Sequence, residues 1–295
     1  MQDLVNIATL ASVYLLFAIG MSLVWGSIGI LNLAHAAVFA TSAFAGHLVL
    51  EWTRMPIGAV VAICVAAGAV VSLLVQVLAF EPILGRTPDV RRAEFPILVG
   101  GLGVGAALLA LVQKATASAP FGFVRSSFTI TAHTWGPVRI SDIQLVIIGA
   151  GIVVGAAAAV WLRRSRTGLA LRAIGVDAET AALMGIKRDR LARVTMAVAG
   201  ALAGLAGALL TYHLGAIETA GADALLIKAF AAIILGGVGS VAGVVVGCVV
   251  LAFAETMVLT YTSGTWVSAI SFGLILLVLL FRPRGIFGRA EVRRT

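Results

Sequence analysis

Three polar side chains inside apolar stretches have the types and spacing that could support chemistry. Glu255 lies deep in one such stretch, and Asn32 and His35 lie near the start of another. A carboxylate in an apolar span is costly and usually faces a partner or an aqueous path. We expect Glu255 to meet Lys228, His35 or backbone donors at a glycine break, in a structural or gating contact or in a substrate contact. Asn32 and His35 are three residues apart, so they are expected to share a helix face, either as hydrogen-bonded core residues or as ligands.

Glycines interrupt the apolar sequence at 26–32 and at 236–240. Irregular backbone at membrane depth is tolerated where it is buried in protein or lines a cavity, and paired breaks of this kind point to a transport pathway. Close helix packing is the alternative, because Gly239, Gly243 and Gly247 are spaced four apart. The predicted substrate pathway therefore comprises Asn32, His35, Glu255, Gly236, Gly237 and Gly239.

No arrangement of residues indicates catalysis. The four histidines are scattered, and both cysteines sit in apolar runs without metal-ligand spacing. The glycines at 100–105 lie inside an apolar span rather than after a strand, and no Walker A segment occurs. We therefore expect no enzyme activity, no cofactor and no metal site, and any ATP hydrolysis must come from another chain.

The composition is that of a membrane protein. Of the 295 residues, 61% are hydrophobic and 12% charged, with a mean hydropathy of +1.09, whereas soluble domains carry about 25% charged residues. We predict an all-α polytopic protein with a single transmembrane domain over 1–295 and eight or nine spans, some of them discontinuous. The expected apolar segments are 4–25, 30–50, 57–80, 95–113, 143–162, 194–211, 225–236, 241–259 and 266–281. The segment 225–236 is too short to cross as one helix, so we expect it to cross as a broken or half helix.

Most of the 21 lysines and arginines lie in three intervals, 81–94, 163–193 and 282–295. Basic loops stay on the cytoplasmic side, so this charge indicates topology rather than nucleic-acid binding. The N-terminus is then outside, and 114–141 forms a strand-like or irregular external loop. The chain starts without a basic signal-peptide region, so we expect the first span to be retained.

The interval 163–193 is the longest polar stretch of the chain. Asp177 is a plausible helix N-cap and Gly185 a plausible stop, which predicts a short helix between them. A charged loop that carries one short helix between two spans is either a docking surface for a soluble cytoplasmic partner or a solvated connector.

Four separate segments, in order, resemble the permease subunits of branched-chain amino acid ABC importers of the LivH type. They are 26-GSIGILNLAHAAVFATSAFAG-46, 165-SRTGLALRAIGVDAETAALMGI-186, 229-AFAAIILGGVGSVAGVVVGCVVLAFAE-255 and 282-RPRGIFGR-289. In the first of them Ala36 replaces the family's glycine. The second resembles the family's ATPase-docking loop, which makes 177–186 the expected coupling helix.

The resemblance implies an ATP-driven importer in the bacterial inner (cytoplasmic) membrane. Its expected partners are ABC ATPase subunits, a second homologous, LivM-like permease subunit, a periplasmic substrate-binding protein and membrane lipid. The same architecture carrying urea, short amides or aromatic acids remains open, as does a stand-alone channel or secondary transporter. The residues assigned to ATPase coupling are Arg166, Gly168, Arg172, Asp177, Glu179, Ala181, Ala182, Leu183, Met184 and Gly185.

Overall fold

Helices of membrane-spanning length dominate the structure. The computed structural model describes residues 1–29, 31–86, 90–124, 126, 128–136 and 138–261, and near the C-terminus 267, 269, 272–273, 276, 280–281 and 285–287. Within these ranges, 7 helices are long and apolar enough to cross a membrane. The all-α polytopic fold is therefore confirmed. The predicted last span, 266–281, lies mostly outside the described residues.

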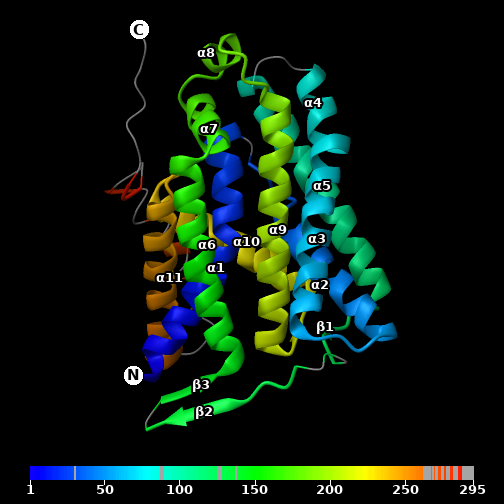
Figure 1. The fold of residues 1–295 in the computed structure, drawn as a ribbon, viewed down its shortest axis with the longest axis vertical. Helices are drawn as coiled ribbons and strands as arrows, with labels where there is room; N and C mark the ends of the chain where they lie inside the picture. Colours follow the sequence, from blue (N-terminus) through cyan, green and yellow to red (C-terminus); the bar gives the residue numbers. More distant parts are fainter. Residues whose placement is uncertain are drawn as a thin grey trace.

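Within the described chain the longest connection between helices is 116–141, and the helices themselves differ widely in length (Figure 1). They are α1 (Gln2–Ile28), α2 (His35–Trp52), α3 (Ile57–Val75), α4 (Glu81–Arg86), α5 (Val90–Ala115), α6 (Asp142–Arg164), α7 (Arg166–Val176), α8 (Ala178–Leu183), α9 (Arg188–Leu214), α10 (Thr219–Gly236) and α11 (Val241–Tyr261), with a π-helical turn η1 (Gln76–Phe80) after α3.

Two segments differ from the prediction. Helix α2 begins at His35 rather than at residue 30. It is not one of the 7 described helices that are long and apolar enough to cross a membrane. Helix α10 has 18 residues, which corresponds to about 27 Å at 1.5 Å per residue. The prediction that this segment is too short was wrong, because the more polar residues 219–224 continue the same helix.

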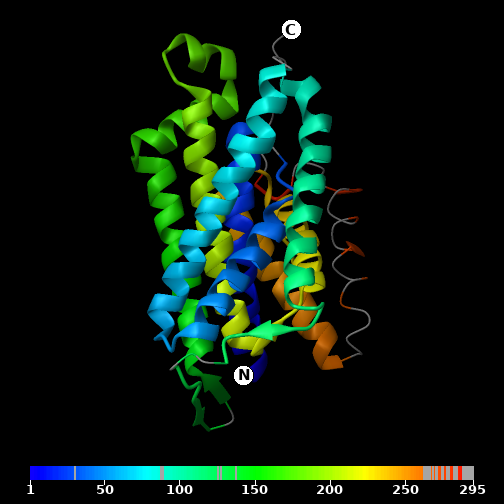
Figure 2. The ribbon, with the colours of Figure 1, turned by 90° about the vertical axis from the view of Figure 1, so that its right-hand side faces the viewer.

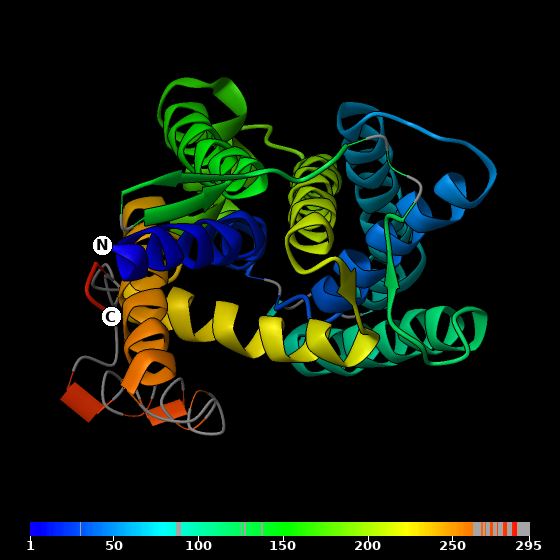
Figure 3. The same cartoon turned by 90° about the horizontal axis from the view of Figure 1, so that it is seen from below.

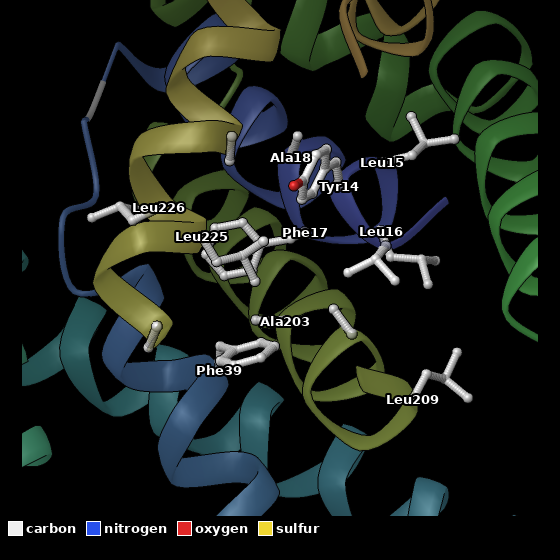
Figure 4. Close-up of a cluster of buried hydrophobic side chains, with 14 of the residues drawn as sticks. Tyr14, Leu15, Leu16, Phe17, Ala18, Phe39, Ala203, Leu209, Leu225 and Leu226 are labelled. Carbon is white, nitrogen blue, oxygen red and sulfur yellow. The ribbon is translucent and has the colours of Figure 1, made fainter. Parts of the chain in front are cut away.

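Helix α1 forms the centre of the bundle. It is apolar on every face, which is typical of a helix surrounded by protein. Of its most apolar 18-residue stretch, 89% is buried. Figure 4 shows Phe17 of α1 near Leu225 of α10, Ala203 of α9 and Phe39 of α2. In contrast, the most apolar 18-residue stretches of α5 and α6 are each only 22% buried. These helices therefore present broad apolar surfaces outward, as lipid-facing helices do.

The two ends of the bundle differ in character. Helices α4, α7 and α8 lie at one end, and the N-terminus lies at the other with the hairpin of β2 (Ala132–Trp135) and β3 (Val138–Ser141) (Figures 1 and 2). The basic intervals 81–94 and 163–193 therefore share an end, as their assignment to one side of the membrane requires. We refer to this end as the basic end and to the opposite one as the hairpin end.

The predicted external loop contains short strands, in agreement with the expectation of a strand-like or irregular segment. Strands β2 and β3 pair with each other, and β1 (Phe121–Gly122) pairs antiparallel with β4 (Ala216–Ile217). The loop leads into α6 through a capping box, in which Ser141 Oγ accepts from Gln144 N at 3.4 Å and Gln144 Oε1 accepts from Ser141 N at 2.9 Å. These contacts fix where α6 begins.

Helices α3 and α9 touch through their backbones. A Cβ added at Gly200 of α9 would lie 2.2 Å from the carbonyl oxygen of Gly68 on α3. A Cβ added at Gly204 would lie 2.1 Å from the carbonyl oxygen of Cys64. Because helices in lipid gain little from hydrophobic burial, such close contacts between small residues are a main source of their association.

Replacing Gly200 with alanine should destabilise the protein, although alanine is the better helix former. The new methyl group meets backbone that cannot move aside, which we expect to cost about 1–3 kcal/mol. Gly103→Ala on α5 is the control, because a Cβ there has nothing within 4 Å and should be neutral or gain up to about 1 kcal/mol. Thermal unfolding of both variants in detergent measures the difference, and equal melting temperatures would contradict the packing assignment.

Candidate functional site

A buried cluster of three side chains joins α1, α10 and α11. Glu255 of α11 is only 1% exposed, and its Oε2 lies 2.9 Å from Lys228 Nζ of α10. The Tyr14 hydroxyl of α1 donates to the same Oε2 at 2.5 Å, and Lys228 Nζ donates to the Tyr14 oxygen at 3.0 Å. Of the partners considered for Glu255 from the sequence, the structure therefore identifies Lys228.

The cluster is electrically balanced. Breaking a buried ion pair is costly because it leaves one charge without compensation, and here a carboxylate and an ammonium meet within a triangle of hydrogen bonds. Tyr14 was missed in the sequence analysis. Its hydroxyl does not stand out in a span that also contains Thr9, Ser12 and Ser22, and its partner Glu255 lies 241 residues away. Figure 3 shows that the helices carrying these residues, α1, α10 and α11, lie side by side.

Asn32 and His35 lie elsewhere, and they do not share a helix face. Asn32 is in the turn before α2, where its carbonyl oxygen accepts from His35 N at 3.3 Å. The prediction was wrong because the irregular segment after α1 extends further than its glycines indicate. The Asn32 side chain contacts Met196 Sδ at 3.7 Å, and His35 Nε2 lies 3.2 Å from the Phe17 carbonyl oxygen. Both are therefore packed between α1, α2 and α9.

The two glycine breaks exist, and they touch each other. Helix α1 ends at Gly29, which has φ of 74°, and α10 ends at Gly237, which has φ of 101°. Glycine adopts positive φ at a lower cost than residues that carry a Cβ atom. A Cβ added at Gly26 would lie 2.3 Å from the Gly239 Cα atom. The breaks from the two halves of the chain therefore form a single irregular region within the bundle.

The glycines after this break pack α10 against α11. A Cβ added at Gly243 would lie 2.2 Å from the Gly236 carbonyl oxygen, and one at Gly247 would lie 2.0 Å from that of Ala232. The packing alternative is thus correct for Gly243 and Gly247. Gly239 precedes α11 and packs on Gly26 instead.

The described tail residues 285–287 complete this region. Ile286 N donates to the Leu235 carbonyl at 2.9 Å, and Phe287 N donates to the Gly236 carbonyl at 3.0 Å. The last carbonyls of a helix lack partners within it, so the tail satisfies two of those of α10. Residues 285–287, although far from the break in the sequence, therefore belong to the same structural unit.

The segment between α6 and α9 contains two helices, whereas only the second was predicted. Ser165 caps the additional helix α7 by accepting from Gly168 N at 2.9 Å. Gly168 is necessary at this sharp turn, since a Cβ would lie 2.5 Å from the Trp161 carbonyl oxygen. Asp177 is a helix N-cap as predicted, because its Oδ1 accepts from Thr180 N at 3.1 Å. Gly185 ends this region with φ of 82°.

The residues assigned to ATPase coupling divide into an inner and an outer set. Ala181 is 4% exposed and packs with Leu171, Ile174 and Leu191, so it holds α8 in place and cannot be a surface contact as predicted. Leu183 and Met184 are 87% and 79% exposed. Arg166, Arg172 and Ala182 are also exposed, and the side chain of Glu179 lies outside the described set.

Removing Lys228 alone should destabilise the protein more than removing both charges of the pair. Lys228→Met leaves Glu255 buried without its counter-charge, and loss of one partner of a buried pair costs about 3–5 kcal/mol. In Lys228→Met/Glu255→Gln no charge remains and Tyr14 keeps a hydrogen-bond partner, so part of the melting temperature should return. Thermal unfolding in detergent measures both variants. If the double variant is as unstable as the single one, the charge balance is not what stabilises this cluster.

The chain matches known proteins over almost its whole length. The family model described as "Branched-chain amino acid transport system / permease component" matches residues 4–279. LivH of Escherichia coli, named a high-affinity branched-chain amino acid transport system permease protein, is 31% identical over 309 residues, which is 100% of this chain and 97% of the relative. BraD of Pseudomonas aeruginosa, with the same description, is 30% identical over 305 residues, again 100% and 97%.

A more distant relative has a different cargo in its name. The fructose import permease FruF of Bifidobacterium longum is 24% identical over 90% of this chain and 73% of its own length. No solved structure matches this chain. Since the family model covers nearly all of the chain, this membrane protein belongs to the family of permease components of branched-chain amino acid transport systems.

Proposed function

We propose that this chain is the membrane-spanning subunit of an ATP-driven importer for branched-chain amino acids in the bacterial inner membrane. The names of the full-length relatives LivH and BraD support the cargo. The 7 apolar helices of the described chain support the role of a multi-pass subunit.

The observation that carries the coupling mechanism is the apolar surface of α8. Leu183, the last residue of α8, and Met184, which follows it, are 87% and 79% exposed. Helix α8 lies at the basic end, beyond the helices that cross the membrane (Figure 1). Neighbouring apolar side chains exposed outside the lipid indicate a surface that a partner covers. A short helix that presents such residues fits a groove on a soluble protein. We assign this surface to the ATPase subunit.

Helix α8 is held firmly against the rest of the protein. Ser165, Gly168 and Asp177 set the turns, and Ala181 anchors α8 through a small apolar cluster that includes Leu191 of α9. A displacement of α8 by the ATPase would therefore be passed directly to α9. Helix α9 contacts α3 through backbone, so the motion would reach the bundle rather than be absorbed in a loop. The exposed Arg166 and Arg172 provide positive charge that would help hold the ATPase subunit against this end of the bundle.

In this proposal the irregular centre of the bundle moves when access switches sides. A binding protein delivers substrate at the hairpin end, a second, LivM-like permease subunit encloses the path, and lipid covers the outward faces of α5 and α6. Glu255, with Lys228, borders the path in this proposal. The residues that shape the breaks beside it are Asn32, His35, Gly236, Gly237 and Gly239.

A different cargo carried by the same architecture is the second candidate. It is favoured by FruF, whose name gives fructose as the imported compound and which aligns with 90% of this chain. Uptake of labelled leucine and fructose by the reconstituted transporter separates the two candidates directly.

Leu183→Asp should prevent the ATPase from binding. A carboxylate at the centre of an apolar contact would lose its water without gaining a partner, so ATPase recovery in a mild-detergent pull-down and leucine uptake should both fall at least tenfold. Leu183→Met keeps an apolar side chain of similar size and is the matched control. An unchanged melting temperature shows that the fold is intact, because Leu183 is on the surface. If the ATPase co-purifies normally with Leu183→Asp, the docking assignment is wrong.

A further inference from the structure

This single chain forms an open cavity of about 510 Å³, whose rim includes the exposed residues Leu214 and Leu259. Its walls come from α1, α6, α9, α10 and α11, and Tyr14 and Lys228 line it. This volume is within the ~300–1,000 Å³ range of small-molecule sites. None of the residues that sequence analysis assigned to the pathway lines the cavity, although Glu255 is bonded to both Tyr14 and Lys228.

The cavity belongs to the hairpin-end half of the bundle. It is bordered by the first half of α1, including Asn6, by the last turn of α9, including His213, and by the first half of α10, including Gly221. These parts of the helices lie toward the end opposite α8 (Figure 1). With the basic end inside the cell, this is the half that faces the outside, where an importer receives its cargo.

Three polar side chains of the lining, Lys228, Thr9 and Thr260, provide a donor and two acceptors, and the other polar residues of the lining are Asn6, Tyr14, Gln144, His213 and Thr256. Lys228, whose side chain is 22% exposed, carries three N–H donors, two of which point to Tyr14 and Glu255. Thr9 Oγ1 donates its proton to the Val5 carbonyl at 2.8 Å. Thr260 Oγ1 has two acceptors for its proton, the Thr256 carbonyl at 2.9 Å and Asp3 Oδ1 at 3.4 Å. With their protons used in this way, both hydroxyl oxygens present lone pairs as acceptors.

The remaining walls are largely apolar. Leu10, Val13, Leu225 and Leu259 line the cavity between these polar groups. A ligand that fits this surface needs a group that accepts hydrogen bonds, a group that donates them and an apolar body. An aliphatic α-amino acid has all three.

We propose that this cavity is an outward-facing site for a zwitterionic aliphatic amino acid, held within one permease chain. The carboxylate of the ligand binds Lys228, its ammonium group binds the Thr9 and Thr260 oxygens, and its side chain lies on Leu10, Val13 and Leu225. This assignment deepens the proposed import function and rests on it for the direction of access.

Charge balance selects a zwitterion over a simple anion. The Lys228 ammonium is already compensated by Glu255 at 2.9 Å, so a fatty acid or another net anion would add an uncompensated charge beside a buried carboxylate. A zwitterion adds none. The Lys228–Glu255 pair thus orients the head group of the ligand without attracting anions in general.

The test compares one ligand with two analogues that each lack one charge. The reconstituted transporter, without its binding protein, is tested for binding of radiolabelled L-leucine, with 4-methylpentanoate and 3-methylbutylamine as competitors. We expect both competitors to bind at least tenfold more weakly than leucine. Competition by 4-methylpentanoate equal to that of leucine would overturn the zwitterion assignment in favour of a general carboxylate site, and the absence of leucine binding would overturn the site.

Two variants of α10 test the location. Ala224 lines the cavity, so Ala224→Trp should fill it and reduce leucine binding and uptake at least tenfold. Ile227→Trp is the matched control, because Ile227 is an exposed residue of the same helix that is not part of the lining, and it should behave as wild type.

Uptake in the presence of the binding protein separates failure of the site from failure of the proposed function. If wild type and Ala224→Trp import leucine equally well, the cavity assignment is wrong while the import function stands. If wild type imports no branched-chain amino acid but binds leucine in a manner that Ala224→Trp abolishes, the import function is wrong while the site stands.

Discussion

Direct backbone contact between helices is the constraint on which this structure depends. Lipid tails are as apolar as leucine side chains, so helices inside a membrane must be held by close packing and by polar bonds. Glycines supply such packing between α3 and α9, between α10 and α11, and between the end of α1 and the break after α10, among other places. Each contact leaves no room for a methyl group, and each therefore fixes the rotation and depth of the two helices concerned.

These packing contacts also position the polar groups. Because α10 and α11 touch through backbone, Lys228 and Glu255 face each other from adjacent helices. The central position of α1 then places Tyr14 against both of them. A buried ion pair contributes little net stability unless its geometry is good and its other bonds are satisfied. Here the backbone contacts supply that geometry, and the result is a balanced polar cluster beside the cavity at the hairpin end.

The two ends of the bundle have separate roles that the helices connect. At the basic end, α8 is held by caps and by the burial of Ala181, and it presents Leu183 and Met184 outward. At the hairpin end, the cavity is bordered by α9 and α10. Helix α9 begins beside α8 and ends at the cavity, so a single rigid element joins the proposed ATPase surface to the proposed amino-acid site.

Local patterns were enough to predict the membrane class, most of the spans, the placement of both basic intervals at one end, both glycine breaks and the short helix after Asp177. These features follow from composition, charge and turn chemistry, which act within a few residues. The partner of Glu255, the role of Tyr14, the burial of Ala181, the position of Asn32 before α2 and the cavity could not be predicted. Each depends on how helices far apart in the sequence are rotated and how deeply they are set against one another, and that relation arises from packing across the whole bundle.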